Sequence, residues 1–340
     1  MDAVEHVRRY ITLTAALGFS VLSGAWYSFA LPGNAQEPRV TIEPRNGSSE
    51  TGKGSADRLG TTIRVNSDLV LIPVMVTDRD DRAVTGLERT HFRLWEDKIE
   101  QTITHFASED VPVSIVVAFD LSGSMGNKFK LSLAALNQFI RSANPEDEFA
   151  LVVFSDQARL LRKFTQDTEA IQNQMLFVQP NGQTALLDAI VLSLEEMRHA
   201  RYSRKAILII SDGGDNNSRY TVNEVKQRVR ESDVQVHAIG IEESLMLSSR
   251  SMEDLGGAAL LSDLATQSGG RLYEIFNTSD LPNVAAKIGS ALRSQYVLGY
   301  VPSAERRDGK YHRVQVKVAQ PPGVSRLRAS FRNGYVAPGN

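Results

Sequence analysis

Two runs of apolar residues along the chain predict strands that are buried on both faces. Residues 114–119 (Ser-Ile-Val-Val-Ala-Phe) contain no charged side chain, and Lys205–Ser211 (KAILIIS) is almost as apolar. Strands of this kind are typical of the interior of a parallel sheet, whereas a half-exposed strand alternates apolar and polar residues. Amphipathic segments lie between the two runs, and Thr184–Arg201 has the clearest helical periodicity in the chain.

Predicted strands and helices alternate over residues 111–293, which favours a doubly wound, mostly parallel, Rossmann-like α/β sheet. Only a short turn joins Phe149–Ser155 to Ala158–Phe164, so the second of these strands should be antiparallel and lie at the sheet edge. The other predicted strands are Val234–Gly240 and Arg271–Ile275, and the other predicted helices span about 127–143, 168–177, 221–232, 259–267 and 279–293.

The flanks of this region have a β-type pattern. Either flank alone would leave exposed strand edges and half of a hydrophobic core. We therefore expect residues 61–110 and 294–340 to form two halves of one β-sandwich, with the α/β domain (111–293) inserted between them. The predicted strands are Asp68–Thr77, His91–Glu96 and Ile99–Phe106 in the first half, and Tyr296–Val301, Tyr311–Val318 and Val324–Phe331 in the second.

The N-terminus has the pattern of an export signal. The basic pair Arg8-Arg9 precedes an apolar stretch over residues 11–31, and small residues at 33 and 35 are spaced for cleavage after Ala35. Residues 1–35 are therefore expected to be a signal peptide, with an uncleaved membrane anchor as the alternative. Residues 36–60 are rich in Gly, Ser, Pro and charged residues and predict a flexible linker.

Composition excludes several function classes. The formal net charge of −2 argues against a dedicated nucleic-acid binder, because there is no basic excess to neutralise phosphates. The absence of cysteine excludes a thiolate nucleophile and a zinc–sulfur site. The chain contains no phosphate-binding GxxxxGK[ST] loop, no GxGxxG and no GxSxG nucleophile motif, and we expect it not to be an enzyme.

Oxygen-bearing side chains follow both buried strands at the points where they end. Asp120, Ser122 and Ser124 follow the first strand, and Asp212 follows Lys205–Ser211. Ligands bind beyond the carboxyl ends of parallel strands, at the position where the strand order reverses. Thr184, in the loop before the long helix, could reach the same rim. Carboxylates and hydroxyls without His or Cys suit a hard cation, so Mg²⁺ is expected, with Mn²⁺ or Ca²⁺ as alternatives.

Several of these polar residues have a simpler structural interpretation as well. Ser122 and Ser124 could cap the helix that follows them. Asp188 could support the site, although a carboxylate that complements the helix dipole is the expected role. Asp215 could approach the rim, but a solvated turn residue is expected. Trp95 is expected in the sandwich core, and His237 is expected to be packed and hydrogen-bonded within its apolar strand.

Three short motifs resemble the metal-ion-dependent adhesion site of von Willebrand factor type A domains. They are Asp-Leu-Ser-Gly-Ser (120–124), Gly-Gln-Thr (182–184) and Ser-Asp-Gly (211–213), and the resemblance covers about 111–293. The flanks further resemble a bacterial exported branch, the von Willebrand factor A-related acidobacterial domain. The residues that carry this second resemblance are Leu-Ile-Pro-Val-Met-Val-Thr-Asp (71–78), His-Phe-Ala-Ser-Glu-Asp (105–110), Tyr-Val-Leu-Gly-Tyr (296–300) and Asn-Gly-Tyr (333–335).

The resemblance implies a role for each site residue. Ser122, Ser124 and Thr184 would bind the cation through their hydroxyls, while Asp120 and Asp212 would hold coordinated waters or bind directly. An open coordination position would accept an Asp or Glu carboxylate from a protein partner. The implied function is an exported adhesion-type binding module in the periplasm, in the cell envelope or outside the cell. A structural component of an envelope complex and a metal-dependent hydrolase are the alternatives.

Overall fold

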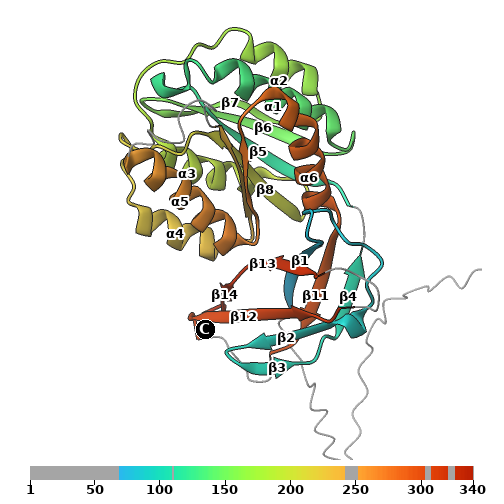
Figure 1. Cartoon of the computed structure of the whole chain (residues 1–340). Helices are drawn as coiled ribbons and strands as arrows, with labels where there is room; N and C mark the ends of the chain where they lie inside the picture. Colours follow the sequence, from blue (N-terminus) through green and yellow to red (C-terminus); the bar gives the residue numbers. More distant parts are fainter. Residues whose placement is uncertain (1–68, 109–110, 242–251, 303–307, 321–325, 340) are drawn as a thin grey trace, which may run out of the picture. The chain divides into compact units, whose positions relative to one another are not determined.

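The computed structural model describes residues 69–108, 111–241, 252–302, 308–320 and 326–339 (Figure 1). The predicted signal peptide or anchor (1–35) and the predicted linker (36–60) lie outside these described residues. Within the described ranges, no helix is both long enough and apolar enough to span a membrane.

A six-stranded sheet with the strand order β10-β9-β8-β5-β6-β7 forms the centre of the α/β domain. Its strands pair in parallel except for β7, which is antiparallel to β6 at the sheet edge, as the short turn predicted. Every residue of β5 is buried, which explains its unbroken apolar run. The bounds are β5 Val113–Asp120, β6 Glu148–Phe154, β7 Ala158–Thr165, β8 Arg204–Ser211, β9 Gln235–Ile241 and β10 Leu272–Ile275.

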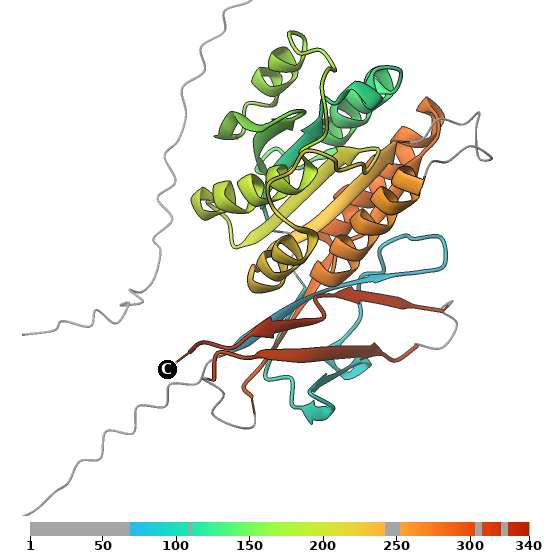
Figure 2. The ribbon, with the colours of Figure 1, turned by 90° about the vertical axis from the view of Figure 1, so that its left-hand side faces the viewer.

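Helices cover both faces of this sheet (Figures 1 and 2). One face packs against α1 (Phe129–Ser142), α2 (Thr168–Met175) and α6 (Leu281–Arg293), and their apolar side chains form one core cluster with the sheet. The opposite face packs against α3, α4 and α5, which form a second core cluster. The predicted doubly wound α/β fold is confirmed. The bounds of the second group are α3 Leu186–Glu196, α4 Val222–Glu231 and α5 Met252–Ser268.

The β-type flanks pair with each other into two further sheets. Their orders are β13-β1-β11-β4 and β14-β12-β2-β3, so each sheet combines strands from before and after the α/β domain. Apolar side chains from both sheets share one core, which confirms an α/β domain inserted into a β-sandwich. The bounds are β1 Val70–Thr77, β2 Phe92–Glu96, β3 Ile99–Gln101, β4 His105–Ser108, β11 Gln295–Tyr300, β12 Tyr311–Val318, β13 Arg328–Phe331 and β14 Gly334–Val336.

Two sandwich predictions were wrong. The segment Ile99–Phe106 is not one strand, because β3 pairs with β2 in one sheet whereas β4 pairs with β11 in the other. The chain crosses between the sheets around Ile103, which is buried in the shared core. Trp95 is only half-buried and lies on the outer face of β2, where Arg93 and Lys317 each approach its ring to 5.1 Å. Strand alternation explains this placement, because Leu94 occupies the inward position.

His237 is packed as expected, but the expected hydrogen bond is absent from the described part of the chain. Its ring is 1% exposed, and neither ring nitrogen has a hydrogen-bond partner among the described residues. The ring stacks on Tyr273 of β10 with a centroid separation of 6.4 Å. Burial, together with the charge of Arg271, lowers the pKa of His237 to about 4. The side chain is therefore held as a neutral, stacked ring.

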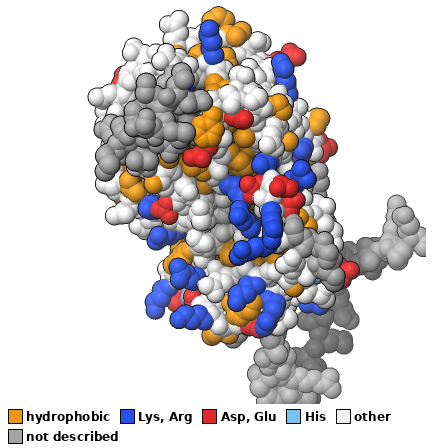
Figure 3. Space-filling model, in the orientation of Figure 1, with side chains coloured by type: hydrophobic (Ala, Val, Ile, Leu, Met, Phe, Trp, Pro, Cys, Tyr) orange, Lys and Arg blue, Asp and Glu red, His pale blue; other side chains and the backbone are white. Residues whose placement is uncertain are grey.

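Acidic and basic side chains are interspersed on the face of the molecule shown in Figure 3. This mixed surface is what a chain with a formal net charge of −2 should present.

Candidate metal centre

The ends of β5 and β8 lie next to each other at the carboxyl edge of the central sheet. The two strands pair in parallel with Phe119 opposite Ile210, so Asp120 and Ser211 follow at the same level. The strand order reverses here, because β6 lies on one side of β5 and β8 lies on the other. The sequence prediction that these two strands lie side by side is therefore confirmed. This is the position where open α/β sheets bind ligands.

Asp120 is buried among hydrogen-bond donors. Its side chain is 0% exposed, and Oδ1 accepts a 2.8 Å hydrogen bond from the Ser122 backbone N–H. Oδ2 accepts a 2.6 Å bond from the Ser211 hydroxyl. Burial raises the pKa of Asp120 to about 6, although these hydrogen bonds oppose the rise; the nearby charge of Asp212 adds to it. A positive charge at this rim would stabilise the ionised carboxylate.

Ser122 and Ser124 face each other, with their hydroxyl oxygens 3.1 Å apart. Ser122 is 1% exposed, while Ser124 is exposed, so the pair extends from the interior to the surface. Neither caps the following helix. The N-cap residue of α1 is Lys128, and Ser122 begins the short 3-10 helix Gly123–Met125 without making a side-chain cap. The two hydroxyls are thus not used as helix caps.

Backbone hydrogen bonds join the loop before α3 to the loop that follows Asp120. Asn181 N–H donates to Leu121 O at 2.7 Å, and Gly123 N–H donates to Gly182 O at 2.9 Å. Gly182 has φ +87°, where any other residue is strained, and a Cβ there would lie 2.6 Å from the Asp156 carboxylate. These contacts place Thr184, which is 4% exposed, beside the Ser122 loop.

The loop that follows Asp212 satisfies backbone N–H groups at the start of α3. The Asn216 side-chain oxygen accepts the Thr184 N–H at 2.8 Å, and Asp215 accepts the Leu187 N–H at 3.2 Å. The Ser218 hydroxyl also accepts the Leu187 N–H, at 3.0 Å. Asp215 is an exposed turn residue, as expected, and its carboxylate also caps α3.

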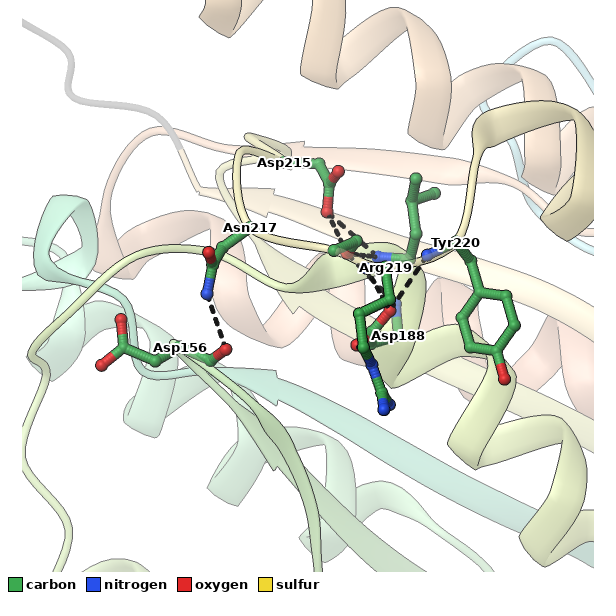
Figure 4. A network of polar contacts seen from close by, with 8 residues as sticks. Asp156, Asp188, Asp215, Asn217, Arg219 and Tyr220 are labelled. Carbon is green, nitrogen blue, oxygen red and sulfur yellow. Dashed lines mark hydrogen bonds and ion pairs between the residues drawn. The ribbon is translucent and has the colours of Figure 1, made fainter.

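Asp188 connects α3 back to the same loop, as Figure 4 shows. Its Oδ1 accepts the Arg219 N–H at 2.8 Å and the Tyr220 N–H at 3.3 Å, and its Oδ2 pairs with Arg219 Nε at 2.8 Å. Asp188 does lie in the first turn of α3, where a carboxylate complements the helix dipole, but these bonds give it a second role. It holds the 212–220 loop against the helix that positions Thr184.

Asp212 has a cationic partner that the sequence analysis did not identify. Lys128 Nζ lies 2.9 Å from Asp212 Oδ2, with the two side chains 18% and 8% exposed. Lys128 is distant from Asp212 in sequence, so no local pattern predicts the pair. The run Asp-Asn-Asn-Ser (215–218) was a weak sequence signal for the other missed residues, Asn216 and Ser218, because such residues favour caps and turns.

The donor chemistry of these loops fits a hard divalent cation. They combine carboxylates and hydroxyls, the ligands that Mg²⁺ prefers. Asp120 and Asp212 bring two carboxylates to the rim, while the Lys128 ammonium compensates one negative charge. The Asp120 carboxylate has no cationic partner among the contacts described above. The residues present therefore fit such an ion in donor type.

The sequence of this region matches a known domain. Residues 115–214 match the family model described as von Willebrand factor type A domain. The chain contains a von Willebrand factor type A domain. The matched segment runs from β5 to the loop after Asp212 and includes all of the candidate metal residues.

Individual proteins match parts of the chain at low sequence identity. An uncharacterized protein of Borreliella burgdorferi is 22% identical over 182 residues, covering 47% of this chain and 53% of the relative. Human inter-alpha-trypsin inhibitor heavy chain H4 is 27% identical over 173 residues, covering 44% of this chain and 18% of the relative. The chain thus spans about half the length of the Borreliella protein and under a fifth of the human one.

Solved structures give weaker likenesses. A von Willebrand factor type A protein from Catenulispora acidiphila has a TM-score of 0.45 at 15% identity, covering 81% of this chain and 75% of its own. The vWF domain of the type V pili tip protein Mfa5 from Porphyromonas gingivalis has a TM-score of 0.43 at 14% identity, covering 55% of this chain and 97% of its own. With TM-scores below 0.5, these likenesses carry no argument about function.

Proposed function

We propose that this chain is an exported binding module that engages an acidic residue of a protein partner through a divalent cation. Asp120, Ser122, Ser124, Thr184 and Asp212 would hold the cation, with Mg²⁺ the expected ion and Mn²⁺ or Ca²⁺ the alternatives. The partner would contribute an Asp or Glu carboxylate to an open coordination position. No enzymatic step is part of this proposal, and nucleic acid is not the expected partner.

One observation carries the proposal most directly. The Ser122 and Ser124 hydroxyls lie 3.1 Å apart beside the buried Asp120 carboxylate, and they are not used as helix caps. Hydroxyls that face each other at the end of a central strand can share one cation. Because hydroxyl ligands are neutral, they leave much of the ion's charge available to attract a further carboxylate. The exposure of Ser124 supports access from solvent.

The matched family supports a role in macromolecular interaction, and the proposed export depends on the sequence pattern of residues 1–35. Attachment to a membrane through that segment, in place of cleavage, remains part of the proposal as its alternative form. Either form would present the module outside the cytoplasm. A periplasmic or cell-envelope partner with an exposed acidic side chain is then the expected ligand.

The metal site is tested by titrating the full chain, after EDTA treatment, with Mg²⁺ in a calorimeter. Wild type should bind the ion, and the double variant Ser122→Ala/Ser124→Ala should bind it at least about tenfold more weakly, a loss of about 1.4 kcal/mol. Ser142→Ala is the matched control, because that hydroxyl donates to Phe139 O within α1. Equal affinity in wild type and the double variant would contradict the proposed site.

The partner chemistry needs a separate test. A peptide array can present each Asp or Glu sequence beside its Asn or Gln counterpart, with Mg²⁺ or with EDTA. The chain should bind acidic peptides only with Mg²⁺ and should lose them in the double variant. Binding that does not distinguish acid from amide would overturn the carboxylate bridge. Metal binding without any peptide preference would favour a structural role in an envelope complex.

A further inference from the structure

Lys128 lies at the junction between the candidate metal centre and α1. It is the N-cap residue of α1, and the Ser132 backbone N–H donates to its carbonyl at 2.9 Å. Its side chain leaves the helix start and places Nζ 2.9 Å from Asp212 Oδ2. The ammonium therefore contacts the carboxylate that the proposed function assigns to the cation.

This ion pair differs from the surface pairs of the chain in its burial. Lys128 and Asp212 side chains are 18% and 8% exposed, whereas Arg93 and Glu100 are 63% and 46% exposed. Exposed pairs are screened by water and contribute little, while buried pairs are screened much less. The contact between the Lys128 ammonium and Asp212 is therefore screened less by water than these exposed pairs.

A lysine ammonium and a metal ion present similar chemistry to a carboxylate. Each is a compact positive charge, and lysine carries its charge on a flexible stem that can move. A divalent cation that approaches Asp212 must either displace the ammonium or remain close to a like charge. Both routes cost free energy that the oxygen ligands have to offset.

We propose that Lys128 competes with the divalent cation for Asp212 and thereby sets the metal concentration at which the site fills. This inference rests on the proposed function, because it needs a cation at Asp212. Lys128 is then an affinity-determining residue of the centre.

If Lys128 competes with the cation, its removal should lower the melting temperature in EDTA but raise the affinity for Mg²⁺. Without Lys128, the buried Asp212 carboxylate loses its counter-ion, so the chain in EDTA should melt at a lower temperature. The same change removes the competitor, so Mg²⁺ should bind more tightly. A residue that only stabilised the helix start would lower the melting temperature without increasing the affinity for Mg²⁺.

The test uses the full chain with Lys128→Met, and with Lys130→Met as the matched control. Lys130 is exposed and two positions further along, so its substitution removes the same formal charge without touching Asp212. Calorimetry with Mg²⁺ should give a dissociation constant about tenfold lower for K128M than for wild type. K130M should match wild type in both affinity and melting temperature in EDTA.

The outcomes separate this inference from the proposed function. If wild type binds Mg²⁺ and K128M binds it no more tightly, the competition is overturned while the metal centre stands. If neither protein binds Mg²⁺, both proposals are overturned. Should K128M fail to fold, Lys128→Gln keeps a hydrogen-bond donor for Asp212 without the charge, and it must also bind Mg²⁺ more tightly than wild type.

Discussion

The hydroxyl of Ser211, the last residue of β8, donates a 2.6 Å hydrogen bond to Oδ2 of Asp120, the last residue of β5. The same Ser211 oxygen accepts the Gly213 N–H at 2.9 Å. A single side chain thus joins the Asp120 carboxylate to the loop that carries Asp212. This bridge connects the part of the candidate metal centre that follows β5 to the part that follows β8.

Replacing Ser211 by alanine should destabilise the fold and loosen the centre. Asp120 would lose a donor while remaining buried, which costs about 1.5–3 kcal/mol for a hydrogen bond to a charged group. Urea denaturation should show this loss, and Mg²⁺ affinity should fall with it. Ser232→Ala is the control, because that hydroxyl donates to the neutral Val229 carbonyl and its loss should cost less. Equal losses in the two variants would contradict the bridge.

Gly257 of α5 packs directly against the loop after Asp212. A Cβ at Gly257 would lie 2.1 Å from Gly213 O, a contact that only a backbone shift can relieve. Gly257→Ala should therefore destabilise the chain by at least about 1–3 kcal/mol and weaken Mg²⁺ binding. Gly256→Ala, one residue away with no atom within 4 Å of its Cβ, should instead be neutral or stabilising by up to about 1 kcal/mol. Thermal unfolding of both variants tests the contrast.

His237 should make the fold sensitive to acid. Its pKa of about 4 lies below its ordinary value of 6.5, so the unfolded chain binds the proton more readily. The stability contribution is complete above pH 6.5 and is lost as the pH falls toward 4, on the order of 3 kcal/mol in total. His237→Phe keeps a ring that can stack on Tyr273. Urea denaturation at several pH values should show that its free energy of unfolding changes less between pH 6.5 and pH 4 than that of wild type. His199 is exposed, so the control variant His199→Gln should show the same dependence of the free energy of unfolding on pH as wild type.

His312 should act in the opposite direction. Burial lowers the pKa of His312, but hydrogen bonds to Asp97 at 2.8 Å and Asp308 at 3.1 Å raise it above its ordinary value overall. The protonated ring then stabilises the sandwich fully below about pH 6.5, and this contribution is lost as the pH rises through the raised folded-state pKa. Melting temperatures of wild type should fall from pH 6.5 upward, and His312→Gln should remove that slope. A slope that persists in the variant would assign it to another group.

Local pattern predicted most of the architecture of the described residues. Uninterrupted apolar runs at β5 and β8 predicted central strands, and the βαβ rhythm predicted their parallel pairing. The β-type flanks predicted a shared sandwich, because neither could bury a core alone. Where local pattern was misleading, the chain changed sheets: Ile99–Phe106 alternates like one strand, yet its ends pair with different partners.

The candidate metal centre shows most clearly which features follow from the sequence and which follow from the tertiary structure. The sequence by itself determined which oxygen-bearing side chains follow the buried strands, because strand ends and turn residues are encoded locally. Only the tertiary structure decided that Lys128 pairs with Asp212 and that Asp215 caps α3. It also decided that His237 is buried with no hydrogen-bond partner among the residues that the structure describes. The partner of a buried polar group depends on which loops meet in space, and residues far apart in the chain carry no shared periodicity that could reveal it.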